Sequence, residues 1–277
     1  MILYLRQFAI RSVNSGMKAR LIAVLAAIFV LSFGTVRQCA LADGNERELI
    51  WSDEFDGDSL NRDNWNVEVN GYGGWNDELQ YYCDSPENIT VSDGTLKITA
   101  LKKHCLSKEY TSARLNTMGK AEFQFGRIEA RMKLPCFKGA WPAFWTLGAG
   151  GKTWPEGGEI DIVEAINDES IAYGTAHWPH EDSYNSSGSS TEFTDLDLDI
   201  TQWHTYSIEW DESRIIWFVD DTPYHMVELT YDADRAALKQ AQYLLLNLAI
   251  GGQWPGFDID DDALPAVMEV DYVRVYR

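Results

Sequence analysis

Three carboxylates crowd into one short apolar segment of the chain, residues 157–165 (GGEIDIVEA). Glu159, Asp161 and Glu164 alternate there with isoleucine and valine, a composition typical of a β-strand. On a regular strand Glu159 and Asp161 share one face, whereas Glu164 falls on the other. A β-bulge at residues 162–163 would restore the parity, because one extra residue returns Glu164 to the face of the other two acids. The segment therefore predicts a bulged strand with its acids on one face.

Paired carboxylates of this kind suit acid–base and nucleophilic chemistry. With the bulge, Glu159 and Glu164 are about four effective residues, or roughly 13 Å, apart along the strand. Side chains that lean toward each other bring the carboxyl groups to about 5 to 5.5 Å, the separation expected of a retaining glycosidase. Mutual repulsion raises one pKa, which makes a general acid available near neutral pH. A calcium-binding or merely solvated acidic edge explains the same residues, and spacing alone does not choose between these interpretations.

The chain after residue 42 has the pattern of short strands separated by turns. Alternating, β-branched and aromatic residues predict strands at residues 89–91, 96–99, 121–134, 159–165, 205–210, 215–219, 243–249 and 268–276. Only residues 233–240 look helical, and the Ser- and Asp-rich residues 181–199 predict a surface loop. Many strands without βαβ alternation predict an all-β fold, an antiparallel β-sandwich or jelly roll. No repeat or long linker divides residues 43–277, which predicts a single domain there.

The first 42 residues differ in composition from the rest. They hold five basic residues and no acidic one, and residues 17–20 (MKAR) lead into an apolar run over residues 21–33 before a small-residue cleavage site at 40–42 (ALA). The run is shorter than the ~20 apolar residues that span a membrane. We therefore expect a secretory signal peptide over residues 1–42, with Met17 as an alternative start. The protein is then secreted, or periplasmic, without stable membrane association; an uncleaved anchor is the less favoured alternative.

The chain is strongly acidic and rich in aromatic residues. It has 277 residues and a net charge of -20, which becomes -25 for the 18 basic and 43 acidic residues left after removal of the signal. This balance argues against nucleic acid or an anionic membrane as a partner, because phosphate binding needs clustered Lys and Arg. Aromatic residues make up 13% of the chain, including 11 Trp, and suit sugar rings or core packing equally. Trp210 and Trp217 are expected to pack in the core or in a hairpin.

Three cysteines, Cys83, Cys105 and Cys136, follow the predicted signal. An odd number allows at most one intramolecular disulfide. Cys83 and Cys105 flank a predicted hairpin and are the better pair, whereas Cys136 suits a small buried apolar position. Free thiols are the alternative to a bridge. No cluster of Cys and His predicts a zinc site.

The acidic segment and eight further motifs resemble those of glycoside hydrolase family 16. Residues 159–164 (EIDIVE) resemble the bulged ExDxxE signature of its laminarinase-like branch. The other motifs, spread over nearly all of residues 43–277, are 51–55 (WSDEF), 78–82 (ELQYY), 110–114 (YTSAR), 126–131 (GRIEAR), 141–145 (WPAFW), 174–177 (GTAH), 247–252 (NLAIGG) and 271–276 (DYVRVY). This resemblance implies a β-jelly roll with a substrate cleft across its concave sheet. It also implies endo-hydrolysis of β-1,3-glucan with retention of configuration.

The family resemblance implies a role for each acid. Glu159 would be the nucleophile, and Glu164 the acid that protonates the leaving oxygen and then the base that activates water. Asp161, between them on the same face, would hydrogen-bond Glu159 and hold its charge state. His177 is expected on the neighbouring strand near Glu164, although a purely structural histidine would have the same sequence signature.

Several residues are candidates for binding the sugar. Trp141 and Trp145 are four residues apart, which places both on one face of a strand. The family places tryptophans of this motif in the cleft, with core packing as the alternative. Trp154 is a further candidate. Arg114 matches a family arginine near the substrate, although an ion pair would also explain it, and Asn76 lies in a stretch that is one residue shorter than in relatives.

A structural calcium site is implied away from the acids. Family members often bind calcium on the convex side through residues that match Glu54, the carbonyl of Gly94 and Asp271, and such oxygen ligands suit a hard cation. No cofactor is expected for catalysis. The expected partner is a β-glucan polysaccharide, and we expect the protein to be a monomer.

Other activities of the same scaffold stay open. A non-catalytic β-glucan-binding protein shares it but usually lacks the acidic motif, and enzymes for mixed-linkage glucan or xyloglucan typically carry the shorter ExDxE. Agarases and carrageenases can carry the bulged motif, although a site for sulfated galactan should be more basic than this chain. The sequence therefore favours β-1,3-glucan over these alternatives.

Overall fold

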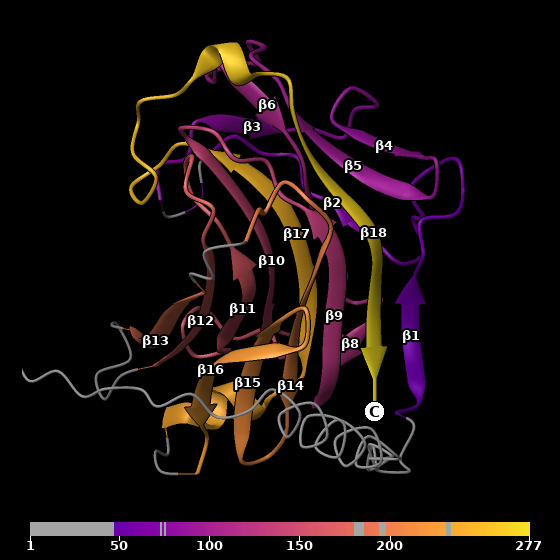
Figure 1. Cartoon of the computed structure of the whole chain (residues 1–277), viewed down its shortest axis with the longest axis vertical. Helices are drawn as coiled ribbons and strands as arrows, with labels where there is room; N and C mark the ends of the chain where they lie inside the picture. Colours follow the sequence, from indigo (N-terminus) through magenta and orange to yellow (C-terminus); the bar gives the residue numbers. More distant parts are fainter. Residues whose placement is uncertain (1–46, 73, 75, 180–185, 194–197, 231–233) are drawn as a thin grey trace, which may run out of the picture. The chain divides into compact units, whose positions relative to one another are not determined.

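The computed structural model describes residues 47–72, 74, 76–179, 186–193, 198–230 and 234–277. The predicted signal peptide, with Met17, lies outside the described residues. The chain from Arg47 to Arg277 forms one unit, and its described part is built almost entirely of strands (Figure 1). No helix in this part is long and apolar enough to cross a membrane.

Two large sheets make up this unit, and all their pairings are antiparallel. The first sheet has the order β16-β15-β14-β9-β18-β5-β4, and β1 also pairs with β18. Its strands are β1 (Leu49–Asp53), β4 (Ile89–Ser92), β5 (Thr95–Ala100), β9 (Gly126–Lys133), β14 (His204–Trp210), β15 (Arg214–Val219), β16 (Thr222–Glu228) and β18 (Ala266–Tyr276).

The second sheet carries the acidic segment in its interior. Its order is β13-β12-β11-β10-β17-β7-β2, and β8 also pairs with β17. Its strands are β2 (Asn66–Val67), β7 (Arg114–Asn116), β8 (Glu122–Phe123), β10 (Ala140–Gly148), β11 (Glu159–Glu164), β12 (Ala172–Pro179), β13 (Ser186–Phe193) and β17 (Gln242–Ile250). Two further strands, β3 (Gln80–Tyr82) and β6 (Tyr110–Ser112), form a small parallel pair.

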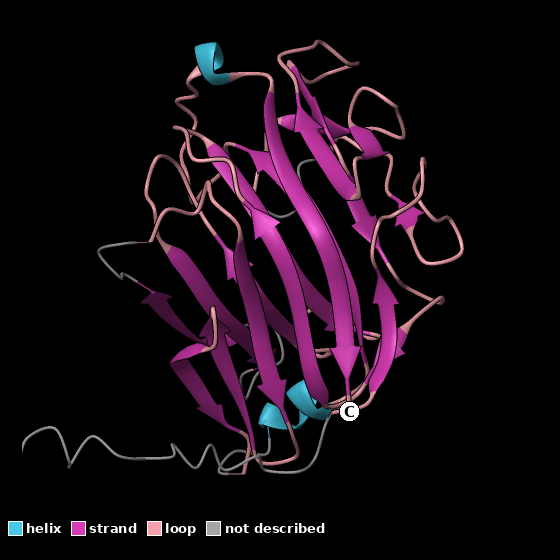
Figure 2. Ribbon diagram, turned by 45° about the vertical axis from the view of Figure 1, so that its right-hand side comes forward, coloured by secondary structure: helices cyan, strands magenta, loops and turns pink. Residues whose placement is uncertain are grey.

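The two large sheets lie face to face as two layers (Figure 2). One hydrophobic cluster fills the space between them, because inward-facing residues alternate along strands of both sheets. Ile128 and Tyr206 from the first sheet and Phe144, Ile160 and Leu246 from the second are fully buried in it. The predicted all-β antiparallel jelly roll is confirmed. The outer face of each sheet does not contribute to this core.

Most predicted strands agree with the structure, but the single strand predicted over residues 121–134 is wrong, because β8 lies in the second sheet and β9 in the first. The chain leaves extended geometry between them at Phe125, whose φ is 63°. The short helical prediction corresponds to a 3-10 helix, η1 (Asp234–Lys239), and a second one, η2 (Asp261–Ala263), was not predicted. The predicted surface loop at residues 181–199 is wrong in its middle, where β13 pairs with β12 at the edge of the sheet. Its sequence, SSGSSTEF, lacks the apolar alternation of the other strands. An edge strand needs only backbone pairing on one side, so composition alone does not reveal it.

The three cysteines that follow the predicted signal peptide form no disulfide in the structure. Cys83 and Cys105 are nevertheless in hydrogen-bond contact, and burial, together with the neighbouring Cys105, raises the pKa of the Cys83 thiol to about 11. Cys136 is half-buried and packs against the central hydrophobic cluster, as expected of a small apolar side chain. The pair favoured by the sequence is therefore the pair that lies in contact.

Candidate active site

Strand β11 carries the acids and contains the predicted bulge. Along β10, residues 145, 144 and 143 pair with residues 161, 163 and 164, which leaves Ile162 without a partner. Along β12, residues 175 and 173 pair with residues 161 and 164, so that Ile162 and Val163 together face Gly174. Both of these β11 side chains are fully buried in the core. The bulge thus turns two successive apolar residues inward and returns Glu164 to the outer face of the sheet.

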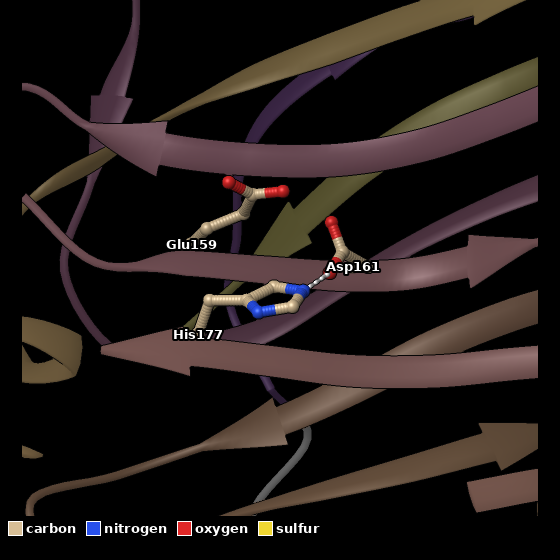
Figure 3. A group of neighbouring side chains, drawn as sticks. All are labelled: Glu159, Asp161 and His177. Atoms are coloured by element: carbon tan, nitrogen blue, oxygen red, sulfur yellow. Dashed lines mark ion pairs between the residues drawn. The ribbon is translucent and has the colours of Figure 1, made fainter. Parts of the chain in front are cut away.

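Three side chains meet beside the bulge: Glu159 and Asp161 on β11, and His177 on β12 (Figure 3). One polar atom from each lies within 4.8 Å of the other two. Glu159 and Asp161 share a hydrogen bond, and Nε2 of His177 lies 3.4 Å from Oδ2 of Asp161. His177 pairs in register with Glu159, not with Glu164. The predicted neighbouring strand is correct, but the expected position near Glu164 is wrong because the antiparallel register places Tyr173 there.

The pKa values of Glu159 and Asp161 are both raised, but different neighbours act on each carboxyl group. Burial, followed by the charges of Glu159 and Glu164, raises the pKa of Asp161 well above its usual range. Burial also raises the pKa of Glu159, but the charge of His177 and hydrogen bonds from Asp161 and Trp154 act against that shift. These neighbours favour the ionised form at Glu159 and the protonated form at Asp161.

Glu164 is held in place by Trp141. Nε1 of Trp141 donates to Oε1 of Glu164 at 2.9 Å. Burial raises the pKa of Glu164 to about 7; the Trp141 hydrogen bond acts against this shift, and the charges of Glu159 and Glu78 add to it. A carboxyl group with such a pKa can both give up and accept a proton near neutral pH, which is what general acid–base chemistry requires.

Glu78 is a further carboxylate of the site that the sequence did not single out. It is 6% exposed and accepts hydrogen bonds from Gln80 Nε2 at 2.7 Å and from the Tyr82 hydroxyl at 3.1 Å. Burial raises the pKa of Glu78, and a hydrogen bond from Asn76 is among the contacts that act against the shift. Asn76 therefore reaches the site through Glu78. The signal in the sequence was present, because Glu78 opens the ELQYY motif.

Two exposed tryptophans lie next to the acids. Trp154 is 47% exposed, and its ring centroid lies 6.2 Å from that of His177. Trp254 is 41% exposed and packs edge-on against Trp141 at 5.5 Å and against Tyr173 at 5.0 Å. Trp141 itself is only 8% exposed. Trp254 therefore presents more surface than Trp141, and it was missed although it lies two residues after the NLAIGG motif.

Trp145 and Arg114 belong to a polar network on the same sheet. Trp145 Nε1 donates to Oδ1 of Asn247 at 2.7 Å, and the Arg114 guanidinium lies 4.8 Å from the Trp145 ring centroid. Nε of Arg114 lies 3.1 Å from a carboxylate oxygen of Glu68, so the ion pair considered for Arg114 is formed. Asn247 also donates to the Tyr82 hydroxyl at 3.3 Å, which connects the network to the partners of Glu78.

The predicted calcium ligands lie on or beside strands of the first sheet, and the two carboxylates among them have arginine partners. Asp271 lies on β18. This strand pairs with β1, which ends directly before Glu54, and with β5, which begins directly after Gly94. Arg274 donates to both carboxylate oxygens of Glu54, at 2.9 and 2.7 Å, and Arg131 donates to Asp271 at 2.6 Å. A cation at this place would compete with two guanidinium groups for the same oxygens. The carboxylates of Glu54 and Asp271 are already neutralised by these guanidinium groups.

Comparison with known proteins places this geometry in a family. The family model for glycosyl hydrolases family 16 matches residues 76–274. A beta-glucanase of Rhodothermus marinus is 40% identical over 247 residues, which cover 83% of this chain and 85% of that protein. The clotting factor G alpha subunit of Tachypleus tridentatus is 39% identical over 264 residues, 92% of this chain but only 37% of that much longer protein.

The fold comparison agrees with the sequence comparison. The X-ray structure of the laminarinase from Rhodothermus marinus has a TM-score of 0.75 and 38% identity, and the match covers 83% of this chain and 97% of that one. The region matched by the family model, residues 76–274, includes the bulged acidic strand. The chain therefore belongs to glycosyl hydrolases family 16 and is a glycosidase related to the β-glucanases and laminarinases of that family.

Proposed function

We propose that this protein is a secreted endo-β-1,3-glucanase that hydrolyses laminarin-type glucan with retention of the anomeric configuration. One observation carries the proposal: the bulge of β11 brings three carboxyl groups to one face, and different neighbours act on each of them. Burial and neighbouring charges raise the pKa of Asp161 well above its usual range, His177 and two hydrogen bonds oppose the rise at Glu159, and the pKa of Glu164 is about 7. Double displacement needs one ionised and one protonated carboxyl group, and pairs whose pKa values are pushed apart supply both.

In the first step, Glu159 attacks the anomeric carbon and the bond from that carbon to the leaving oxygen breaks. The proton of Glu164 goes to the leaving oxygen, so the departing glucan ends in a neutral hydroxyl. In the second step, Glu164, now ionised, takes a proton from water, whose oxygen attacks the anomeric carbon and releases Glu159. The hydrogen bond between Asp161 and Glu159 in the free enzyme lowers the pKa of Glu159 and so favours the ionised form of the nucleophile.

The exposed aromatic rings support a polysaccharide substrate that runs across this face of the sheet. Trp154 contacts His177, beside Glu159, and Trp254 contacts Trp141, which binds Glu164. Exposed rings on both sides of the acids suit stacking against sugars on both sides of the cleaved bond, as an endo-acting enzyme requires. The names of the relatives, a beta-glucanase and a laminarinase, support glucan as that polysaccharide.

A product assay tests the substrate and the stereochemistry together. Purified protein is incubated with laminarin, curdlan, lichenan, agarose and carrageenan, and the anomer of the first product is read by NMR. We expect hydrolysis of laminarin and curdlan in preference to the galactans, with the β-anomer formed first. Initial formation of the α-anomer would exclude double displacement, and preferential cleavage of agarose would move the protein to a galactanase activity.

Azide can separate the two catalytic roles. In Glu164→Ala, an aryl β-glucan oligosaccharide still forms the intermediate on Glu159, and azide then attacks it to give a β-glycosyl azide. In Glu159→Ala, azide replaces the nucleophile and gives the α-glycosyl azide. We expect both variants to lose most of their activity without azide. The reverse pair of products would exchange the two roles, and near-normal turnover in either variant would remove that residue from the mechanism.

Export and assembly form a second part of the proposal. The basic, apolar and small-residue pattern of residues 1–42 supports cleavage before Asp43, and N-terminal sequencing of protein from the medium tests it. A mature chain that begins at any residue before Asp43 would contradict the predicted site. Size-exclusion chromatography with light scattering tests the expected monomer.

The calcium site remains a prediction. Because two arginines already bind the carboxylates of Glu54 and Asp271, the useful comparison is the thermal midpoint in EDTA and in added CaCl2. A midpoint that rises with calcium in the native chain, and no longer does so in Glu54→Gln, supports the site. Equal midpoints in EDTA and calcium would count against it.

A further inference from the structure

The bulge of β11 is held from beneath by a tryptophan of the opposite sheet. We propose that Trp217 is a positioning residue for catalysis, because its indole N–H fixes the backbone at the point where the bulge sets the phase of Glu164 relative to Glu159 and Asp161. The inference rests on the proposed roles of these acids. It assigns a specific task to a side chain that the sequence had suggested only for packing.

The hydrogen bond connects the two layers of the fold. Trp217 lies on β15 of the first sheet, is fully buried, and its Nε1 donates to the backbone carbonyl of Asp161 at 2.8 Å. Asp161 is the last residue of β11 before the register breaks on both sides. A bulge disrupts the ladder locally, and a buried carbonyl without a donor is costly. Trp217 supplies a donor at this place.

Gly174 leaves the space that this contact needs. It lies on β12 directly opposite the bulge, between the partners of residues 161 and 164. A Cβ at Gly174 would lie 2.6 Å from Cδ1 and 3.0 Å from Cγ of Trp217, and 2.5 Å from the Tyr224 hydroxyl. The indole is rigid and enclosed, so it could not avoid such a methyl group without moving away from Asp161. The absence of a side chain at Gly174 and the indole of Trp217 are therefore two parts of one arrangement.

The consequence for the acids follows from the geometry. Residues on either side of the bulge point to the same face only while the extra residue is accommodated there. The side chain of Asp161 shares a hydrogen bond with Glu159, and the backbone carbonyl of the same residue accepts one from Trp217. A shift of this peptide would displace Asp161 and Glu164 relative to Glu159. Misplacement of a catalytic group by about 1 Å can cost on the order of 100-fold in rate.

The chain offers a matched control for the loss of an indole. Trp210, on the adjacent strand β14, is 2% exposed, and its Nε1 has no hydrogen-bond partner among the described residues. Trp217→Phe and Trp210→Phe therefore remove similar ring volume from one core, but only the first removes a hydrogen bond. We expect Trp217→Phe to lower kcat on laminarin by on the order of 10- to 100-fold with KM within about twofold, whereas Trp210→Phe leaves kcat within about twofold. Thermal midpoints are measured for both.

A second replacement guards against a Trp217 variant that fails to fold. Incorporation of the benzothiophene analogue of tryptophan at position 217 keeps the size and shape of the ring and removes only the N–H donor. Its kcat should fall as in Trp217→Phe, and Gly174→Ala, which keeps both tryptophans, should lower kcat in the same way. A kcat for the benzothiophene protein within about twofold of native would overturn the proposal, as would equal kcat losses in Trp217→Phe and Trp210→Phe.

Failure of this inference can be told apart from failure of the proposed function. If Glu159→Ala and Glu164→Ala behave as proposed in azide while the Trp217 variants keep full kcat, only the positioning role is lost. If the glutamate variants keep near-normal turnover, the catalytic assignment fails whatever the Trp217 variants do.

Discussion

The protonation of Glu164 is set by neighbours that act in opposite directions. Burial and the charges of Glu159 and Glu78 raise its pKa to about 7, and the hydrogen bond from Trp141 lowers it. As the general acid, Glu164 is active only while protonated, so kcat/KM should fall as the pH rises through its pKa. The basic limb of the pH–rate profile therefore reports the pKa of this one group, and each neighbour can be tested by the direction in which it moves that limb.

Replacement of Glu78 should move the basic limb to lower pH. Glu78→Gln removes a negative charge that raises the pKa of Glu164, so the variant acid loses its proton at a lower pH than in the native enzyme. The measurement is kcat/KM on laminarin from pH 4 to 9. Glu87→Gln is a control, because Glu87 is exposed and pairs with Lys103 instead. A limb that stays in place in Glu78→Gln would show that Glu78 acts only by packing.

Replacement of Trp141 should move the same limb the other way. Trp141→Phe removes the N–H that stabilises ionised Glu164, so the pKa of Glu164 rises and the variant keeps its proton to a higher pH. The height of the profile is expected to fall as well, because Trp141 also supports Trp254. Only the position of the limb tests the hydrogen bond; a shift to lower pH would contradict it.

Which residues form the site was partly accessible from the sequence. Glu159, Asp161 and Glu164 lie on one short segment, so strand parity and one bulge were enough to predict their common face. Glu78, Trp254 and Trp217 lie far from that segment in the chain and reach it through tertiary packing. The alternation of residues along one strand does not show which distant residues pack against it. The neighbours that shift the pKa of Glu164 were therefore not predicted from the sequence, although Glu164 itself was.

At the scale of elements, apolar patterns predicted strands that pack against the core and failed at the edge strand β13, whose sequence has no apolar pattern. The strands over β5, β15 and β17 were predicted within one residue at each end. Strand β13 was missed because its Ser-rich sequence has no apolar period, and among the described strands it pairs with β12 alone. Residue alternation records burial against a core, whereas an edge strand is specified by the backbone of its neighbour.

The end of β1 illustrates an element fixed by one buried acid. Asp53 is 9% exposed and accepts hydrogen bonds from Trp65 Nε1 and Asn64 Nδ2, both at 2.9 Å, and from the Phe55 amide at 3.1 Å. It therefore joins β1 to the turn that carries Trp65, a fully buried residue. Removing the acceptor leaves buried donors unsatisfied, and each such group costs on the order of 1 to 3 kcal/mol.

We expect Asp53→Ala to destabilise the fold by about 2 to 3 kcal/mol, which lowers the thermal midpoint by roughly 5 to 10 °C. The measurement is thermal unfolding followed by circular dichroism. Asp58→Ala is the matched control, because Asp58 is exposed and its only side-chain hydrogen bond in the described structure is with Ser59 at 3.4 Å. Equal midpoints for the two variants would contradict the role of Asp53.

For the whole molecule, the dominant property is its excess of negative charge. The net charge is -20 for the full chain and -25 for residues 43–277. Several of the described ion pairs are exposed on both sides, as between Arg62 and Asp84 or Lys103 and Glu87. Exposed pairs contribute only about 0 to 1 kcal/mol each. Unpaired acids therefore repel one another across the surface, and this repulsion opposes the compact state.

Added salt should consequently stabilise this protein. Screening shortens the Debye length from about 10 Å at 0.1 M to 3 Å at 1 M, which weakens the repulsion among many acids more than it weakens the fewer attractive pairs. We expect the thermal midpoint to rise by several degrees between about 20 mM and 0.5 M NaCl and then to level off, because screening saturates whereas salting-out does not. The increase should shrink near pH 4, where many surface carboxylates are protonated. A midpoint that falls with NaCl at pH 7 would mean that the surface ion pairs outweigh the net charge.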